Sequence, residues 1–177
     1  MEKEKFEKLL LKTAFSFMAC DGDIDASEVT LVKNLASTTD MFGALNPTEE
    51  LDKMLAELNR IGGEFLRGYF DELTSADLSQ EEELKLIKIS IDTIYADNKV
   101  AYSEMKFFKI VRDKLKVDDD AILAVMPDIE EFLENDIISP SYIANLTRDY
   151  LGSFAAPAVG SIKDISAQIE QIQKEKK

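Results

Sequence analysis

Hydrophobic residues recur at steps of three and four along almost the whole chain, which is the period of an amphipathic helix. The first such segment carries its apolar positions at Phe6, Leu9, Leu10, Thr13, Ala14, Phe17 and Met18. Phe107 and Phe108 are adjacent, so they cannot face the same way, and one is expected to be partly exposed or to lie between two halves of the fold. No segment alternates strictly over enough residues to predict a strand. The pattern therefore predicts an all-α, multihelical fold of roughly seven to nine helices.

Helix start and stop signals divide this pattern into elements. Asp25 with Glu28, and Ser79 with Glu82, have the spacing of capping boxes, in which each side chain satisfies a backbone N–H of the first turn. Asn46-Pro47-Thr48-Glu49 places a cap residue before a proline at the first helical position. The remaining signals predict a break at Gly62-Gly63 and further helices at about 103–115, 118–125 and 127–134 and from Pro140 onward.

Two segments of the chain look alike. Met18–Val29 reads MACDGDIDASEV, and Ile94–Met105 reads IYADNKVAYSEM. At the offset of 76 positions between them, the first Asp, the Ser and the Glu of each segment coincide. An apolar helical pattern precedes each segment, so the repeated unit is predicted to be a helix, a tight acidic turn and a second helix.

Each copy of the turn has the residues that a sharp helix-to-helix connection needs. Gly22 and Asn98 occupy matching positions, and both residue types tolerate a left-handed backbone at a helix end. Ile24 and Val100 also match, and we expect these side chains to drop into the core and fix the turn.

The repeat defines the domain organisation. Residues 1–151 are predicted to form one helical domain, with the repeats near 6–36 and 82–115. Residues 152–160 are rich in Ala, Pro and Gly and are predicted to be a connector. Residues 161–177 are predicted to form an amphipathic helix, and its apolar seam consists of Ile162, Ile165, Ile169 and Ile172. This helix either docks on its own domain or pairs with a partner, including a second copy in a homodimer.

Composition and charge narrow the function classes. The 177 residues include 35 acidic and 21 basic side chains, giving a net charge of −14, with one cysteine and no histidine. Without histidine, the chain cannot form a Ser-His-Asp triad, a Cys-His pair or a zinc site of His and Cys ligands. The negative charge opposes binding along a phosphate backbone, so no nucleic-acid partner is expected. The lack of an apolar leader or span, together with the free Cys20, favours a cytoplasmic location.

The acidic turns are the candidate site for chemistry. Six acids are candidate metal ligands: Asp21, Asp23, Asp25 and Glu28 in the first copy, and Asp97 and Glu104 in the second. Carboxylate oxygens suit hard cations, so the ion would be calcium or magnesium. The second copy is poorer by two carboxylates, because Lys99 and Ala101 stand where the first copy has acids.

Two explanations of these acids stay open. The first turn matches only the second half of an EF-hand loop, because the two upstream ligand positions are Phe17 and Ala19. A metal would therefore need further oxygens, for example from the other copy. Alternatively, helix capping and the favourable interaction of Glu28 or Glu104 with a helix dipole explain each turn without a ligand.

The turn sequences ACDGDIDASE and YADNKVAYSE resemble the repeated motif of the TerB-like family, which includes tellurite-resistance proteins and the N-terminal domain of DjlA-type co-chaperones. The resemblance covers about residues 4–115. It implies an all-helical fold of two pseudo-symmetric halves, divalent-metal binding through surface acids, and a role in cytoplasmic, often membrane-facing, stress-response assemblies. The acids that carry over are Asp21, Glu28, Asp97 and Glu104, whereas Asp23 and Asp25 are additions of this chain and Asn98-Lys99 departs from the motif.

The expected function is therefore that of a non-enzymatic accessory module. It would bind a hard divalent cation weakly through its acidic turns, dock partner proteins, or do both, and any membrane association would be indirect, through a partner. The alternative is a metal-free helical scaffold or interaction protein. A carboxylate- and metal-dependent enzyme ranks last, because helical metal enzymes place acids on facing helices and these acids cluster in turns.

Overall fold

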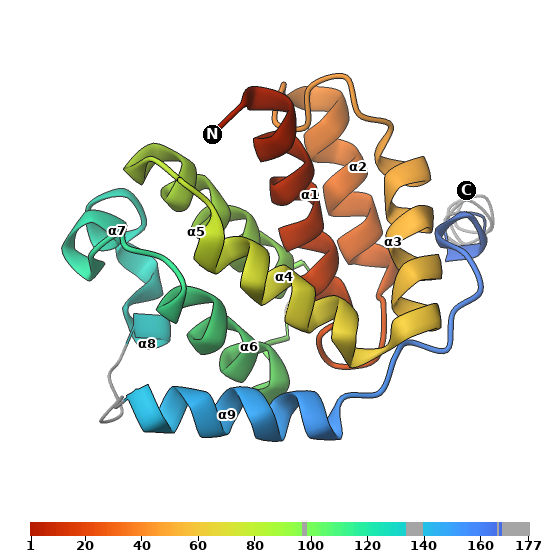
Figure 1. The fold of residues 1–177 in the computed structure, drawn as a ribbon. Coiled ribbons are helices and arrows are strands. Elements are labelled where there is room, and N and C mark those ends of the chain that lie inside the picture. The colour runs from red at the N-terminus through yellow and green to blue at the C-terminus, as the bar shows by residue number, and fades with distance from the viewer. Residues whose placement is uncertain (97–98, 134–139, 166, 168–177) are drawn as a thin grey trace.

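The computed structural model describes residues 1–96, 99–133, 140–165 and 167, and over these residues the chain is helical and has no strand (Figure 1). The elements are α1 (Lys3–Ala19), α2 (Ala26–Thr38), α3 (Pro47–Ile61), α4 (Gly63–Ser75), α5 (Gln80–Ile94), α6 (Tyr102–Asp113), α7 (Asp119–Val125), the 3₁₀ segment η1 (Pro127–Ile129), α8 (Glu130–Leu133) and α9 (Pro140–Ser153). The predicted all-α, multihelical class is confirmed. No helix in these ranges is both long and apolar enough to cross a membrane.

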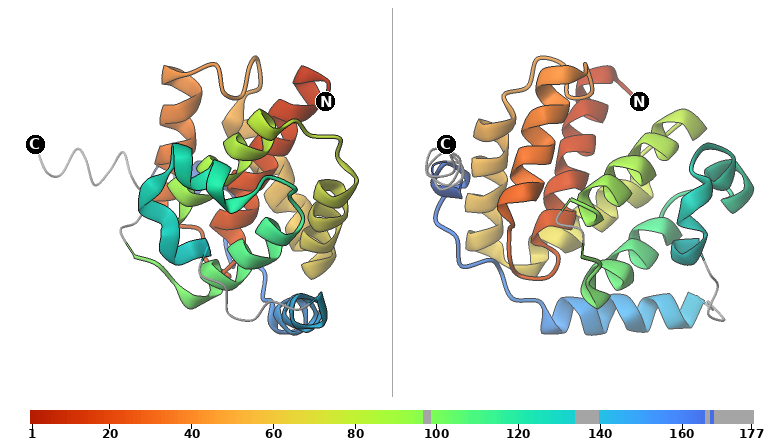
Figure 2. Two further views of the ribbon diagram at one scale, coloured as in Figure 1. Left: turned by 90° about the vertical axis from the view of Figure 1, so that its left-hand side faces the viewer. Right: turned by 180° about the vertical axis from the view of Figure 1, so that it is seen from behind.

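α1 is the central helix of the fold. It lies side by side with α2 and α3 in Figure 2, and it packs most extensively against α5. All seven apolar positions predicted for it are buried. Burial extends beyond that face, because every residue from Leu9 to Cys20 except Lys12 is buried. The helix is therefore surrounded by the rest of the domain, and its amphipathic pattern is confined to its first two turns.

The predicted capping residues begin their helices. Asp25 and Ser79 are the N-caps of α2 and α5, and each heads a complete capping box. The Asn46 side chain accepts a hydrogen bond from the backbone N–H of Glu49 at 3.4 Å, and Pro47 is the first residue of α3. α3 ends at Ile61, and α4 begins two residues later, at Gly63.

The sequence repeat coincides with a repeat of helices. With 76 subtracted from its residue numbers, α5 falls on 4–18 and α6 on 26–37, which lie within α1 and α2. The two turns differ in how their matching aliphatic residues pack. Ile24 is 4% exposed, as expected, whereas Val100 is 43% exposed, so the expectation that Val100 drops into the core is wrong. The matching aliphatic residue thus anchors the first turn only, and at the second turn it stays at the surface.

Both faces of α6 are covered. Phe107 and Phe108 are each fully buried, so of the two expected alternatives, partial exposure of one ring or a place between two halves of the fold, the first is excluded. The ring of Phe107 packs edge-on against Phe17 of α1, with 4.8 Å between centroids, while Phe108 packs against Phe132 of α8 at 5.5 Å. Since α6 lies between these elements, adjacent positions can both be apolar.

The C-terminal segment returns to α3. α9 extends through Ser153, so the connector begins two residues later than predicted. Residues 162–165 are helical, and Ile162 and Ile165 are buried. Asp52 of α3 accepts hydrogen bonds through Oδ1 from the backbone N–H of Ile162 at 2.7 Å and from the Ser161 hydroxyl at 3.1 Å. The first half of the predicted seam thus docks on its own domain, and Ile169 and Ile172 lie outside the described residues.

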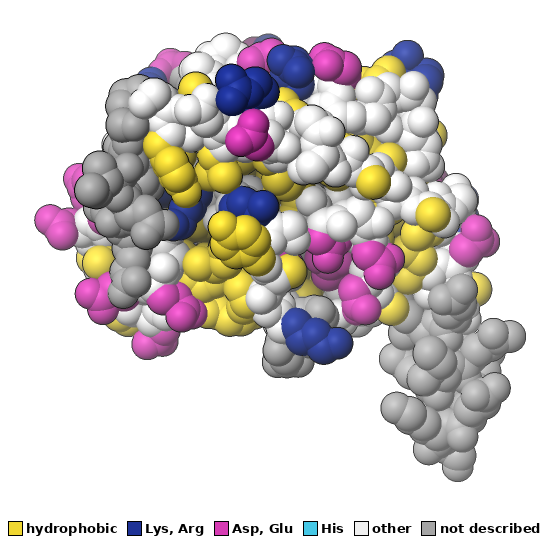
Figure 3. All heavy atoms as spheres, turned by 90° about the horizontal axis from the view of Figure 1, so that it is seen from below, with side chains coloured by type: hydrophobic (Ala, Val, Ile, Leu, Met, Phe, Trp, Pro, Cys, Tyr) yellow, Lys and Arg dark blue, Asp and Glu magenta, His cyan; other side chains and the backbone are white. Residues whose placement is uncertain are grey.

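Few large hydrophobic side chains are exposed in the described part of the chain: Met1, Tyr95, Val100, Tyr102, Val125 and Tyr142. Figure 3 shows the underside of the molecule, where hydrophobic side chains gather and acidic side chains border them. The most exposed of the six, Tyr102, has the ammonium of Lys106 4.5 Å from its ring centroid. A cation–π contact therefore partly compensates its exposure.

Candidate functional site

The three aspartates of the first acidic turn are exposed, and each caps a backbone N–H nearby. Asp21 Oδ1 accepts from the backbone of Asp23 at 3.0 Å, and Asp23 Oδ1 accepts from the backbone of Ile24 at 3.0 Å. Asp25 Oδ1 accepts from the backbone of Ser27 at 2.7 Å and from the Ser27 hydroxyl. One oxygen of each carboxylate is thus engaged within the turn that carries it.

The glutamates of the two turns occupy equivalent, buried positions. Glu28 Oε2 accepts the backbone N–H of Asp25 at 2.8 Å, and Glu104 Oε2 accepts the backbone N–H of Ala101 at 2.6 Å. Each glutamate is 7% exposed. This reciprocal contact is the half of a capping box that ties the first helical turn back to its cap residue.

The two turns are electrostatically coupled. Burial, together with the negative charges of Asp21 and Glu104, raises the pKa of Glu28 from 4.5 to about 9. Hydrogen bonds from Ser27 hold the pKa of Asp25 below its usual range, and the charge of Lys99 on the second turn lowers it as well. The second turn therefore lies close enough to the first to shift the pKa of both Glu28 and Asp25. With a pKa of about 9, Glu28 is protonated at neutral pH.

The described carboxylates do not form a metal-binding group. Over the ranges that the structure describes, no three acidic or cysteine side chains are placed to hold a metal ion. The geometry fits helix capping better, because the capping hydrogen bonds engage the acids, Glu28 is neutral, and Lys99 brings a positive charge to Asp25. Asp97 lies outside the described residues. Cation binding by the six predicted acids stays a prediction.

Cys20 is not positioned for chemistry. The residue is 2% exposed, and burial, followed by the charges of Glu104 and Asp21, raises the pKa of its thiol well above the usual range. The reactive thiolate is therefore disfavoured. Its backbone carbonyl has a structural role, because it accepts a hydrogen bond from the Tyr150 hydroxyl of α9.

The connector after α9 passes against the first turn. Gly22 has φ of +87°, a left-handed conformation that an L side chain rarely adopts, and a Cβ there would lie 2.9 Å from the carbonyl oxygen of Ala155. Two features therefore require glycine at this position: its backbone conformation and the close approach of another chain segment. Tyr150 and Ala155 together fix the turn to the C-terminal part of the domain.

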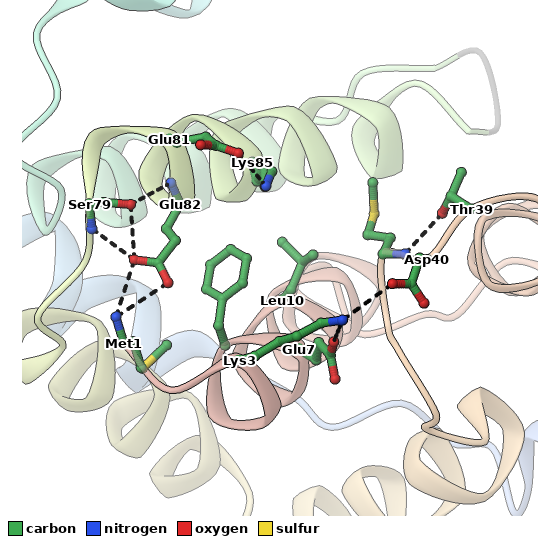
Figure 4. Close-up of a pocket in the computed structure, with 12 residues that line it drawn as sticks. Met1, Lys3, Glu7, Leu10, Thr39, Asp40, Ser79, Glu81, Glu82 and Lys85 are labelled. Carbon is green, nitrogen blue, oxygen red and sulfur yellow. Dashed lines mark hydrogen bonds and ion pairs between the residues drawn. The ribbon is translucent and has the colours of Figure 1, made fainter.

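A pocket that was not predicted from the sequence lies at the other end of α1. It has a volume of about 720 Å³ and is bounded by the start of α1, the loop after α2 and the start of α5 (Figure 4). Phe6, Leu10 and Met41 form its apolar part. Phe6 and Leu10 are buried and Met41 is half-buried, so these side chains present a fixed apolar surface.

Charged side chains surround this apolar surface. The Lys3 ammonium lies 3.3 Å from Asp40 Oδ2 and 3.6 Å from Glu7 Oε1, as Figure 4 shows. On the opposite wall, the Lys85 ammonium lies 2.7 Å from Glu81 Oε1. Glu82 also lines the pocket and accepts from the amino group of Met1 at 3.4 Å. Four carboxylates and two lysines thus line the pocket.

Glu7 is the unusual member of this set. It is 8% exposed, and its Oε1 has no hydrogen-bond partner among the described residues. Its carboxylate packs against Gly43, where φ is +56° and a Cβ would lie 2.2 Å from Glu7 Oε2. A charged residue beside Phe6 and three positions before Leu10, on a buried face, was the sequence signal for this site.

Comparison with known proteins adds no relative. No protein-family model matches the chain, and neither a search of curated proteins nor one of solved structures found a match. The resemblance to the TerB-like family therefore rests on the two turn motifs alone and stays a hypothesis. The function has to be argued from the geometry of this chain.

Proposed function

We propose that this protein is a non-enzymatic accessory module that docks a partner protein at the pocket between α1 and α5. The observation that carries the proposal is the combination of an apolar surface, formed by Phe6, Leu10 and Met41, with a carboxylate-rich rim on a chain of net charge −14. Protein interfaces commonly join an apolar centre to a polar rim in this way. The charge favours a partner surface of opposite sign.

The resemblance to TerB-like proteins supports the same class of function. It implies a cytoplasmic stress-response assembly, with any membrane association made through the partner. We include both as parts of the proposal. The helix caps at the two turns serve this role by holding the domain rigid, which reduces the free energy lost on ordering when a partner binds.

The test is partner capture with variants of the pocket. Met41→Lys places a cation on the apolar surface, and Met126→Lys makes the same change at another half-buried methionine, which does not line the pocket. We expect the native chain and Met126→Lys to retain a partner, and Met41→Lys to lose it, in affinity purification followed by binding of the purified pair. Circular dichroism checks that both variants fold. Equal capture by all three proteins would contradict docking at this pocket.

A second candidate function is weak binding of calcium or magnesium at the acidic turns. The observation in its favour is the burial of Glu28 near two further carboxylates, Asp21 and Glu104, which a cation would offset. Calorimetry with calcium, magnesium and manganese tests it. Binding should give heat with the native chain and less after Asp21→Asn combined with Glu28→Gln. Equal heat, or none with the native chain, leaves the alternative of a metal-free scaffold.

A further inference from the structure

The buried carboxylate of Glu7 lacks the hydrogen bonds that its position demands. A carboxylate that is removed from water needs donors, and leaving one oxygen unpaired costs free energy. Glu7 Oε1 has no hydrogen-bond donor among the described residues, and the ammonium of Lys3, with which it forms an ion pair, lies 3.6 Å away. The residue is more than nine-tenths buried in the wall of a pocket. A ligand can therefore supply the hydrogen-bond donor that Glu7 Oε1 lacks.

Lys3 occupies the place that such a donor would take. Its side chain is 75% exposed, and its ammonium is shared between Glu7 and Asp40 at 3.6 and 3.3 Å. In Figure 4, the Lys3 side chain runs along the pocket edge to reach both carboxylates. The Lys3–Asp40 pair is exposed on both sides, and exposed ion pairs contribute little to stability, so this long lysine is readily displaced. The pocket thus holds two carboxylates with a weakly held cation between them.

Arginine fits these two carboxylates better than lysine does. Its planar guanidinium carries five N–H donors in a fork, so it can donate to two acids at once, whereas an ammonium acts as a point charge. The neighbouring apolar surface of Leu10 and Met41 would take an aliphatic side chain next to that arginine. The further acids of the rim, Glu81 and Glu82, disfavour an anionic ligand.

We propose that the pocket recognises a segment of the partner protein in which an arginine lies beside leucine-like side chains, with the guanidinium bound by Glu7 and Asp40 in place of Lys3. The inference rests on the proposed docking function and adds the chemistry of the partner. The occupant is a peptide segment, because the pocket combines an apolar surface for one side chain with a charged pair for the next.

The test is fluorescence anisotropy with a labelled peptide, acetyl-Gly-Ser-Leu-Leu-Arg-Leu-Gly-Ser, and the native chain. Replacing the peptide's arginine by citrulline, which is neutral and of the same shape, should weaken binding about tenfold. Glu7→Gln should cause a similar loss, and circular dichroism checks that the variant folds. Asp40→Asn gives the same readout at an exposed position.

Matched variants separate this site from bulk charge. Glu4→Gln makes the same charge change on the same helix outside the pocket, and it should leave affinity within about twofold of the native value. Lys3→Met removes the competing cation and should tighten binding several-fold, whereas Lys5→Met, an exposed lysine paired with Glu2, should not. Equal effects of Glu7→Gln and Glu4→Gln, or of Lys3→Met and Lys5→Met, would overturn the inference.

The outcome also separates this inference from the function that it refines. Absence of peptide binding, together with partner capture that Met41→Lys abolishes, would reject the arginine-containing segment and leave docking at the pocket in place. Partner capture that survives Met41→Lys would reject docking there, whatever the peptide does.

Discussion

Glu28 and Glu104 each accept a backbone N–H three residues earlier in the chain, and each is buried at the start of a helix. At the scale of the residue, this contact explains why both copies of the repeat carry a glutamate at that place. The same acids had suggested a metal site, because spacing in a sequence does not distinguish a ligand from a cap. Which donor an oxygen meets depends on the packed structure, and here the nearest donors are backbone amides.

The raised pKa of Glu28 predicts a pH dependence of stability. Its carboxyl binds a proton more tightly in the folded chain, with a pKa of about 9, than in the unfolded chain, near 4.5. The stabilisation is complete below pH 4.5 and is lost as pH rises through 9. Glu28→Gln keeps an acceptor for the Asp25 amide and removes the titration. The free energy of unfolding of the variant, relative to that of the native chain, should therefore rise by on the order of 1–3 kcal/mol from pH 5 to pH 8.5.

Urea denaturation at the two pH values measures this difference. Glu57→Gln is the control, since it removes an exposed carboxylate whose ion pair with Arg60 spans 3.9 Å. A Glu28→Gln curve parallel to the native one across the range would show that Glu28 is ionised in the folded chain.

Gly22 gives the second prediction at this scale. Gly22→Ala places a methyl group at a φ of +87° and 2.9 Å from the Ala155 carbonyl oxygen, so it should destabilise the fold by about 1–3 kcal/mol. Gly68→Ala is the matched control, because Gly68 lies within α4 and the methyl group added there would meet no neighbouring segment within 4 Å, and it should stabilise by about 0.5–1 kcal/mol. Chemical denaturation that gives both variants the same sign would contradict this account of the turn.

At the scale of the element, helix starts were predictable because their signals are local. Asp25, Asn46 and Ser79 each cap a helix where the sequence predicts one. The burial of Phe108 and the exposure of Val100 were not predictable, since they depend on distant elements. Phe108 is covered by Phe132 of α8, whose position relative to α6 no local pattern specifies.

The attachment of the C-terminal segment to α3 gives a prediction at the same scale. Asp52→Ala removes the acceptor for the Ile162 amide and the Ser161 hydroxyl, so it should cost about 1 kcal/mol and release the segment first. Hydrogen exchange at Ile162 should then accelerate roughly fivefold or more. Lys53→Ala, at the neighbouring exposed position, should leave that amide protected. Unchanged protection in Asp52→Ala would mean that contacts other than these two hydrogen bonds hold the segment.

At the scale of the whole molecule, the repeat was readable from the sequence, but the meeting of its two turns was not. Glu104 acts on Glu28, and Lys99 acts on Asp25, only because packing of the two helix pairs brings the turns together. The pocket at the opposite end of α1 likewise combines residues from three parts of the chain. The sequence indicates this pocket only through Glu7, an acidic residue on a buried helix face. Glu7 lies among other charged residues of the same helix, so its sequence context does not distinguish it from them.

Methyl NMR of the six methionines shows whether the arginine- and leucine-containing peptide binds at the pocket between α1 and α5. Met41 lines the pocket, and Met105 follows Glu104 at the second turn. We expect the peptide to shift the Met41 methyl signal in a saturable manner and to leave that of Met105 in place. A shift of Met105 on addition of calcium or magnesium, with Met41 unmoved by the peptide, would contradict binding of the arginine-containing segment at this pocket.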